Sequence, residues 1–227
     1  MKRFWADVAI DTDGVIRLDG RPVRTPGRAP LALPTPALAD AIADEWRAVG
    51  DTIDPRAMPL TGLANAAIDR VAPDPQAFAA GLAAYAESDL LCYRAEAPAE
   101  LVTREEAAWD PLLAWARKRY DIHFETISGV MHQPQPAATI ARLADAVASR
   151  PPFELVALQP IVTIAGTLVG ALALAEKAIS ADDLWSAAIV DETWQAELWG
   201  EDPEAAKARA ARRQDFDSAV RFLSLLE

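Results

Sequence analysis

The sequence has little of the residue types on which disulfide frameworks and metal sites depend. Its 227 residues include one cysteine, Cys92, and two histidines, His123 and His132. A single cysteine excludes an intramolecular disulfide framework and is most simply explained by a reducing compartment. A zinc site needs three or four ligands, and no Cys-x-x-Cys or His-x-x-x-His spacing occurs. We therefore predict no metal site, ordinary histidines and a packed, unreactive Cys92.

Catalytic and nucleotide-binding loops are also missing. The sequence has no Gly-x-Ser-x-Gly elbow, no P-loop and no dinucleotide-binding Gly-x-Gly-x-x-Gly. The stretch from Gly166 to Gly170 lacks the lysine that follows a phosphate loop, and it lies in an apolar run. We predict no catalytic residues and no cofactor.

Positive charge is in deficit, with 22 basic against 34 acidic residues and a net charge of −12. Nucleic acids and anionic membrane surfaces are themselves negative, so we expect neither as a partner. The same balance favours solubility and suits a partner with a basic or neutral surface. The hydrophobic content of 52% is ample for a packed core in a chain of this length.

The longest apolar run, Leu155–Ala175, is the one segment that resembles a membrane span. Pro160 shortens its usable helix to roughly 16 residues, below the ~20 that cross a bilayer. No cluster of basic residues flanks it. We predict a single buried central helix over 153–175, whose Gly166 and Gly170 permit close helix packing, and no membrane insertion.

The N-terminal residues, Met1 to Asp7, lack both the apolar core of a signal peptide and the composition of a transit peptide. We expect a cytoplasmic protein of a bacterium, or a processed form from the mitochondrial matrix.

The first 33 residues alternate apolar and polar side chains around two Asp-Gly turns, Asp13-Gly14 and Asp19-Gly20. This pattern is a strong hairpin signal, because glycine accepts the positive φ of such turns. Helical periodicity then begins after Thr35 and prevails in the rest of the chain, except at Ile122–Thr126, whose alternation indicates either a short strand or an extended link. The predicted fold is α+β, with a small β-rich N-terminal domain over 1–60 and a larger all-helical domain over 61–227.

Helix boundaries follow from capping residues and prolines. Candidate N-caps are Thr35, Thr61, Thr103 (with Glu106) and Ser180 (with Asp183). The predicted helices are 36–49, 61–72, 75–85, a segment after Thr103, 136–148, 153–175, 180–199 and 203–226.

One acidic stretch near the C-terminus is the candidate site. Glu192, Gln195 and Trp199 are spaced i, i+3 and i+7, so a helix places them on one face, and Gly200 ends that helix. An acid and an amide beside a tryptophan offer hydrogen bonds around an aromatic anchor. The alternative is that Trp199 is a core residue and Glu192 a structural hydrogen-bond acceptor. Sequence alone leaves both interpretations open.

Several short sequence motifs together resemble those of one family, the F1-ATPase assembly chaperones that bind the alpha subunit. They occur in order from about residue 8 to residue 225, and they are specific as a set. The motifs are Leu18–Pro26, Asp44–Trp46 with Asp51–Ile53, Met58–Thr61, Asp89–Arg94, Trp109–Leu112 with Trp115–Ala116 and Lys118–Tyr120, and Glu192–Gly200.

The resemblance implies a β-rich N-terminal part, a helical C-terminal part and an ATP-independent holding role. The client would be the free F1 alpha subunit, shielded until the beta subunit replaces the chaperone. The resemblance also implies that Glu192, Gln195, Trp199 and Gly200 form part of the client-binding face. Many relatives carry a His-Asp pair just after this motif, whereas this chain has Glu201-Asp202.

Two alternatives stay open. One is an enzyme using acids such as Glu192 and Glu197, although their spacing of five puts them on different helix faces. The other is a general binding module for another oligomeric complex. We expect a monomer, a state that the sequence itself leaves open.

Overall fold

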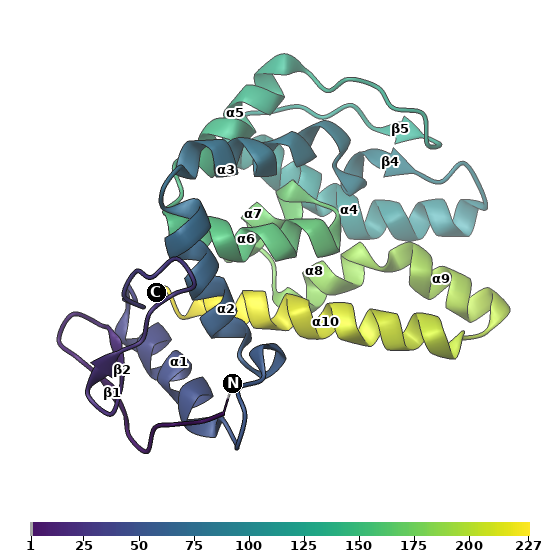
Figure 1. The fold of residues 1–227 in the computed structure, drawn as a ribbon. Coiled ribbons are helices and arrows are strands. Elements are labelled where there is room, and N and C mark those ends of the chain that lie inside the picture. Colours follow the sequence, from purple (N-terminus) through teal and green to yellow (C-terminus); the bar gives the residue numbers. More distant parts are fainter. Residues whose placement is uncertain (1) are drawn as a thin grey trace. The chain divides into compact units, whose positions relative to one another are not determined.

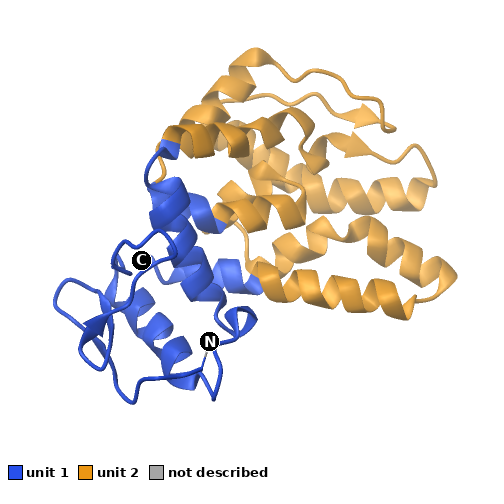
Figure 2. Ribbon diagram, in the orientation of Figure 1, with its two compact units in different colours: residues 1–75, 151–157, 217–227 blue, residues 76–150, 158–216 orange. Residues whose placement is uncertain are grey.

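The computed structural model describes residues 2–227 and forms two compact units (Figure 2). Of the described residues, the first unit holds 2–75, 151–157 and 217–227, and the second holds 76–150 and 158–216. A small antiparallel sheet near the N-terminus is followed by helices, which confirms the predicted α+β class (Figure 1). The domain boundary at residue 60 stays a prediction.

The first unit begins with a three-stranded antiparallel sheet in the order β1-β2-β3. Its strands are β1 (Val8–Ile10), β2 (Ile16–Leu18) and β3 (Arg21–Pro22). Both predicted turns are present, with φ of +73° at Gly14 and +76° at Gly20. A side chain at Gly14 would also meet the carbonyl oxygen of Leu33, so the position requires glycine on two counts.

Helix α1 (Pro36–Ala48) packs on this sheet and begins as its sequence predicts. The Thr35 side chain caps it by accepting a hydrogen bond from the Leu38 amide at 3.2 Å. Leu38 and Ile42 face the core and are fully buried. A capping threonine, a proline at the first position and an apolar stripe therefore suffice to define α1.

Helix α2 (Pro59–Ala66) is capped by a distant carboxylate. Glu45 of α1 accepts hydrogen bonds from the amides of Leu60 and Thr61, both at 2.8 Å, and from the Thr61 hydroxyl at 2.7 Å. The prediction that Thr61 begins this helix is wrong. The helix starts two residues earlier, because Glu45 supplies the acceptors that a local cap would provide.

Replacing Glu45 with glutamine is expected to lower the free energy of unfolding by about 1–2 kcal/mol, because an amide nitrogen cannot accept the bonds that cap α2. Urea unfolding measures the loss. Glu106→Gln, at an exposed position of α4 (Ala99–Tyr120), is the matched control. Equal stability of the two variants would show that the Glu45 cap contributes nothing.

Most of the remaining helices lie in the second unit, and α6 and α10 contribute residues to both units. Their bounds are α3 (Pro75–Ala83), α4 (Ala99–Tyr120), α5 (Ala137–Ala148), α6 (Pro152–Ala165), α7 (Leu168–Ala175), α8 (Ala181–Ala188), α9 (Val190–Trp199) and α10 (Pro203–Ser224). Two short strands, β4 (Tyr93–Arg94) and β5 (Ile127–Ser128), pair in parallel. Short 3₁₀ segments span 55–57, 84–88 and 90–92, and a π-helical turn spans 67–71.

The prediction of one central helix over 153–175 is wrong. The chain breaks at Gly166, whose φ is +69°, and the Thr167 side chain caps α7 through the Gly170 amide at 2.9 Å. Close packing at Gly170 is confirmed, because a Cβ there would lie 2.5 Å from Leu184 Cδ1. Helix α7 is buried as expected. Within residues 2–227, none of the helices combines the length and the apolarity needed to cross a membrane.

Two further boundary predictions are corrected. Helix α4 begins at Ala99, so Thr103 is not its cap; the Thr103 hydroxyl donates to the Ala99 carbonyl within the helix. The predicted helix over 180–199 is two helices, α8 and α9, which meet at Ile189. Its predicted start is confirmed, because the Ser180 side chain accepts from the Asp183 amide at 3.1 Å.

Two carboxylates act as polar centres of the second unit. Asp89 is fully buried and accepts from the amides of Leu91 at 3.1 Å and Val169 at 3.0 Å, so it caps both the 3₁₀ turn over 90–92 and helix α7. Three residues later in the chain, Cys92 is buried, which confirms a packed sulfur, and burial raises the pKa of its thiol.

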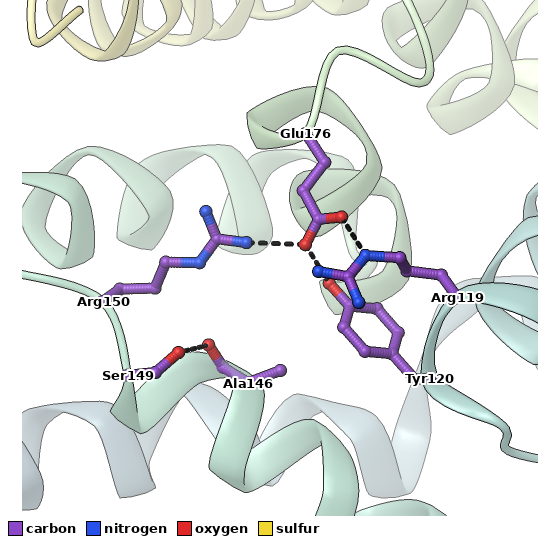
Figure 3. A network of polar contacts seen from close by, with 6 residues as sticks. All are labelled: Arg119, Tyr120, Ala146, Ser149, Arg150 and Glu176. Carbon is purple, nitrogen blue, oxygen red and sulfur yellow. Dashed lines mark hydrogen bonds and ion pairs between the residues drawn. The ribbon is translucent and has the colours of Figure 1, made fainter.

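The second centre is Glu176, which follows α7 (Figure 3). It accepts hydrogen bonds from Arg119 Nε at 2.5 Å, from the Tyr120 hydroxyl at 2.7 Å and from Arg150 Nη2 at 2.9 Å. These partners end α4 and follow α5, so one carboxylate joins three segments of the second unit.

Candidate functional site

Helices α9 and α10 run side by side in the second unit and are joined by a tight turn (Figure 1). Gly200 ends α9 with a φ of +85°, and its amide donates to the Ala196 carbonyl at 3.0 Å. The predicted end of this helix is therefore confirmed. Asp202 then caps the start of α10 by accepting from the Glu204 amide at 3.0 Å.

The face between these helices is hollowed into a groove of about 450 Å³, which we call the α9–α10 groove. All four predicted site residues line it: Glu192, Gln195, Trp199 and Gly200. Helix α10 supplies the opposite wall, with alanines 205 and 208 beside Arg209 and Arg212. The helical spacing read from the sequence therefore brings the candidate residues together.

Trp199 is the most unusual member of this groove. Its side chain is 78% exposed, and the neighbouring Leu198 is 54% exposed. The other six tryptophans are buried or half-buried. The alternative that Trp199 is a core residue is therefore wrong. A large aromatic side chain left in water is typical of a surface that another molecule covers.

Glu192 is held by a charged partner across the groove. Arg212 Nη2 lies 2.5 Å and 2.6 Å from the two carboxylate oxygens of Glu192. Both side chains are about two-fifths exposed, so the pair stays accessible to water. An exposed ion pair of this kind is worth about 0–1 kcal/mol, so it can exchange partners at little cost.

The basic wall of the groove was not anticipated from the sequence. Arg209 and Arg212 are three apart on α10, which places them on one helix face. Arg209 is paired with Glu201, as Arg212 is with Glu192. Only the basic spacing was visible in the sequence, because the pairing depends on the turn that folds α10 back along α9.

The groove offers recognition chemistry: an aromatic anchor, an exposed amide at Gln195, two exchangeable ion pairs and a wall that contains alanines. Across residues 2–227, no three His, Cys, Asp or Glu side chains are grouped so that they could hold a metal ion.

Comparison with known proteins gives a consistent result. A model of the ATP12 chaperone protein family matches residues 2–117. The crystal structure of Atp12 from Paracoccus denitrificans is 44% identical, with a TM-score of 0.93, and the match covers 100% of this chain and 98% of that one. A variant of the same protein, with an aspartate replaced by lysine, matches with a TM-score of 0.94.

A putative chaperone from Agrobacterium tumefaciens is 42% identical, with a TM-score of 0.93 over 100% of this chain and 86% of the other. The class defined by these matches is that of chaperones. The chain belongs to the ATP12 chaperone family, which confirms the resemblance to F1-ATPase assembly chaperones.

Proposed function

We propose that this chain holds the free alpha subunit of the F1 ATP synthase, without ATP, until the beta subunit replaces it. In this proposal the α9–α10 groove contacts the client. The observation that carries the proposal is the exposed Trp199 in the C-terminal motif, whose four residues line one groove.

The physical argument begins with the client. Subunits of obligate complexes expose apolar surfaces that aggregate when unpaired. An aromatic side chain at the centre of a contact contributes strongly to affinity, because it buries a large area with few rotatable bonds. Trp199 and Leu198 provide such a contact, and Gln195 provides hydrogen bonds beside it.

The charge pairs around the tryptophan supply selectivity in this proposal. A client side chain that replaces Arg212 at Glu192, or Glu192 at Arg212, exchanges one ion pair for another. The displaced partner stays in contact with water, so the exchange costs little for a client of matching charge, whereas a client that brings a like charge to this position is disfavoured. Release by the beta subunit then needs no nucleotide, only competition for the same client surface.

The test is co-expression of this chain with the F1 alpha subunit from the same source, without beta, followed by size exclusion. We expect a one-to-one complex that added beta subunit displaces. Trp199→Ala is expected to weaken binding by about 30-fold, the loss typical of a central aromatic contact. Phe4→Ala, which removes another exposed aromatic side chain, is the control.

Failure of the wild-type chain to bind folded alpha subunit would overturn the proposal. If the Trp199 and Phe4 variants bind the alpha subunit equally well, the α9–α10 groove does not contact the client. Capture of chemically unfolded, unrelated proteins with the same affinity would instead identify a general binding module.

A further inference from the structure

A second groove lies on the other side of α9, within the same unit. It has a volume of about 620 Å³ and is lined by strand β4, the segment over 128–131, helix α4 and the first turn of α9. We call it the β4–α4 groove. Gln195 lines both this groove and the α9–α10 groove, so α9 forms the ridge between them.

The floor of the β4–α4 groove holds two carboxylates that face each other. Glu105 is 1% exposed and accepts from the Ala95 amide at 2.8 Å. Burial, and then the neighbouring Asp191, raise the pKa of Glu105. Two acids facing each other in a buried setting oppose folding, and packing alone gives no reason for them.

Unused hydrogen-bonding atoms also line this groove. Arg94 is 8% exposed; its Nη2 binds Asp110 at 2.6 Å, and its guanidinium lies over the Trp109 ring at 5.1 Å. Its second terminal nitrogen, Nη1, is buried and has no hydrogen-bond partner within residues 2–227. The same holds for Oδ1 of Asp191. A buried donor and a buried acceptor left unpaired cost free energy unless a ligand completes them.

The rim of the groove is apolar and open. Val130 is 92% exposed and Met131 is 78% exposed. Together with Leu198 and Trp199 on α9 and Phe4 in the first unit, they make up the large hydrophobic side chains that the described residues leave exposed. Methionine adapts its shape to different apolar partners, so Met131 suits the rim of a groove that binds a peptide chain.

We infer that the β4–α4 groove binds an extended basic segment of a partner protein. A lysine or arginine side chain enters between Glu105 and Asp191, a backbone carbonyl accepts from Arg94 Nη1, and an apolar side chain lies under Val130 and Met131. Charge complementarity selects this occupant, because three acids line the groove, Glu96, Glu105 and Asp191, against Arg94, whose charge is already paired with Asp110. That this partner protein is the F1 alpha subunit rests on the proposed function.

The first experiment uses a defined probe and no alpha subunit. A nine-residue peptide of alternating leucine and lysine is titrated into the ¹⁵N-labelled chain, and a leucine–glutamate peptide is the matched control. We expect the lysine peptide to shift the amide resonances of Ala95 and Gly129, and the glutamate peptide to leave them unchanged. Absence of these shifts, or equal shifts with both peptides, would overturn the inference.

The variant Asp191→Asn separates binding from folding. It removes one charge of the facing pair, so it is expected to weaken the lysine peptide about tenfold or more, while the melting temperature stays equal or rises by a few degrees. Asp145→Asn, at an exposed position of α5, is the control. If both variants bind the peptide like wild type, the acids do not hold the cation and the inference fails.

The alpha subunit is then tested separately. If it binds wild type but is not displaced by the lysine peptide, the groove is not a client contact. If it fails to bind at all, the proposed function falls while the peptide result stands. A dimer in light scattering that Asp191→Asn dissociates would assign the groove to a second copy of the chain and overturn the inference.

Discussion

Replacement of Asp89 with alanine is expected to lower the free energy of unfolding by about 3 kcal/mol, because it leaves two buried backbone amides, Leu91 and Val169, without their acceptor. The same change removes the cap from helix α7 at the centre of the second unit. Urea unfolding measures the loss. Asp145→Ala, at an exposed position, is expected to change stability by less than about 0.5 kcal/mol and serves as the control.

The same variant carries a pH signature. Burial raises the pKa of Asp89 from 3.8 to about 6, although hydrogen bonds from Val169, Thr167 and Leu91 oppose the shift. The folded state therefore binds this proton more tightly than the unfolded state. The resulting stabilisation is present below pH 3.8 and is lost as the pH rises through about 6. The stability difference between wild type and Asp89→Ala should shrink over that interval; a constant difference would contradict the assignment.

Replacement of Glu176 with alanine is expected to cost about 2 kcal/mol, since it removes the one carboxylate that Arg119, Tyr120 and Arg150 share (Figure 3). Burial alone would raise the pKa of Glu176, but the hydrogen bonds from Tyr120 and Arg119 lower it overall. Its contribution is therefore present above the ordinary value of 4.5 and is lost as the pH falls through the lower folded value.

Thermal unfolding of the Glu176 variant between pH 3 and pH 7 tests both parts of this prediction. The higher melting temperature of the wild type relative to the variant should disappear as the pH falls toward 3. Glu106→Ala, exposed on α4, is the control. An advantage that persists unchanged at pH 3 would show that packing, and not the charge network, supplies the stability.

Local patterns in the sequence were enough to predict the sheet, helix α1 and the end of α9. Each of these depends on neighbours in the chain: Asp-Gly turns, a capping threonine, or a glycine with positive φ. The start of α2 was not predictable in this way, because its cap is Glu45, 15 residues from Leu60. The break at Gly166 was also missed, because glycine in an apolar run serves close packing as readily as a turn.

The motifs that carried the family resemblance fall into two groups, those whose residues make contacts within the fold and one whose tryptophan is exposed. Glu45 caps α2, Asp89 caps α7, Arg94 lies over Trp109, and Arg119 binds Glu176. These residues explain the fold. The C-terminal motif differs, because Trp199 stays in water. The sequence predicted Glu192, Gln195 and Trp199 on one helix face, but the arginine partner of Glu192 came only from the tertiary structure.

The composition of the first unit bears on the order in which the parts of the chain fold. Its core needs residues 217–227: Phe222 stacks on Phe153 at 6.1 Å, and the Thr35 hydroxyl donates to the Leu225 carbonyl at 2.5 Å. The first unit is therefore completed by a contact between residues 190 positions apart in the sequence. Contacts between residues so far apart in the sequence form slowly, because a long loop must close first, so we expect the first unit to fold more slowly than the helices of the second unit.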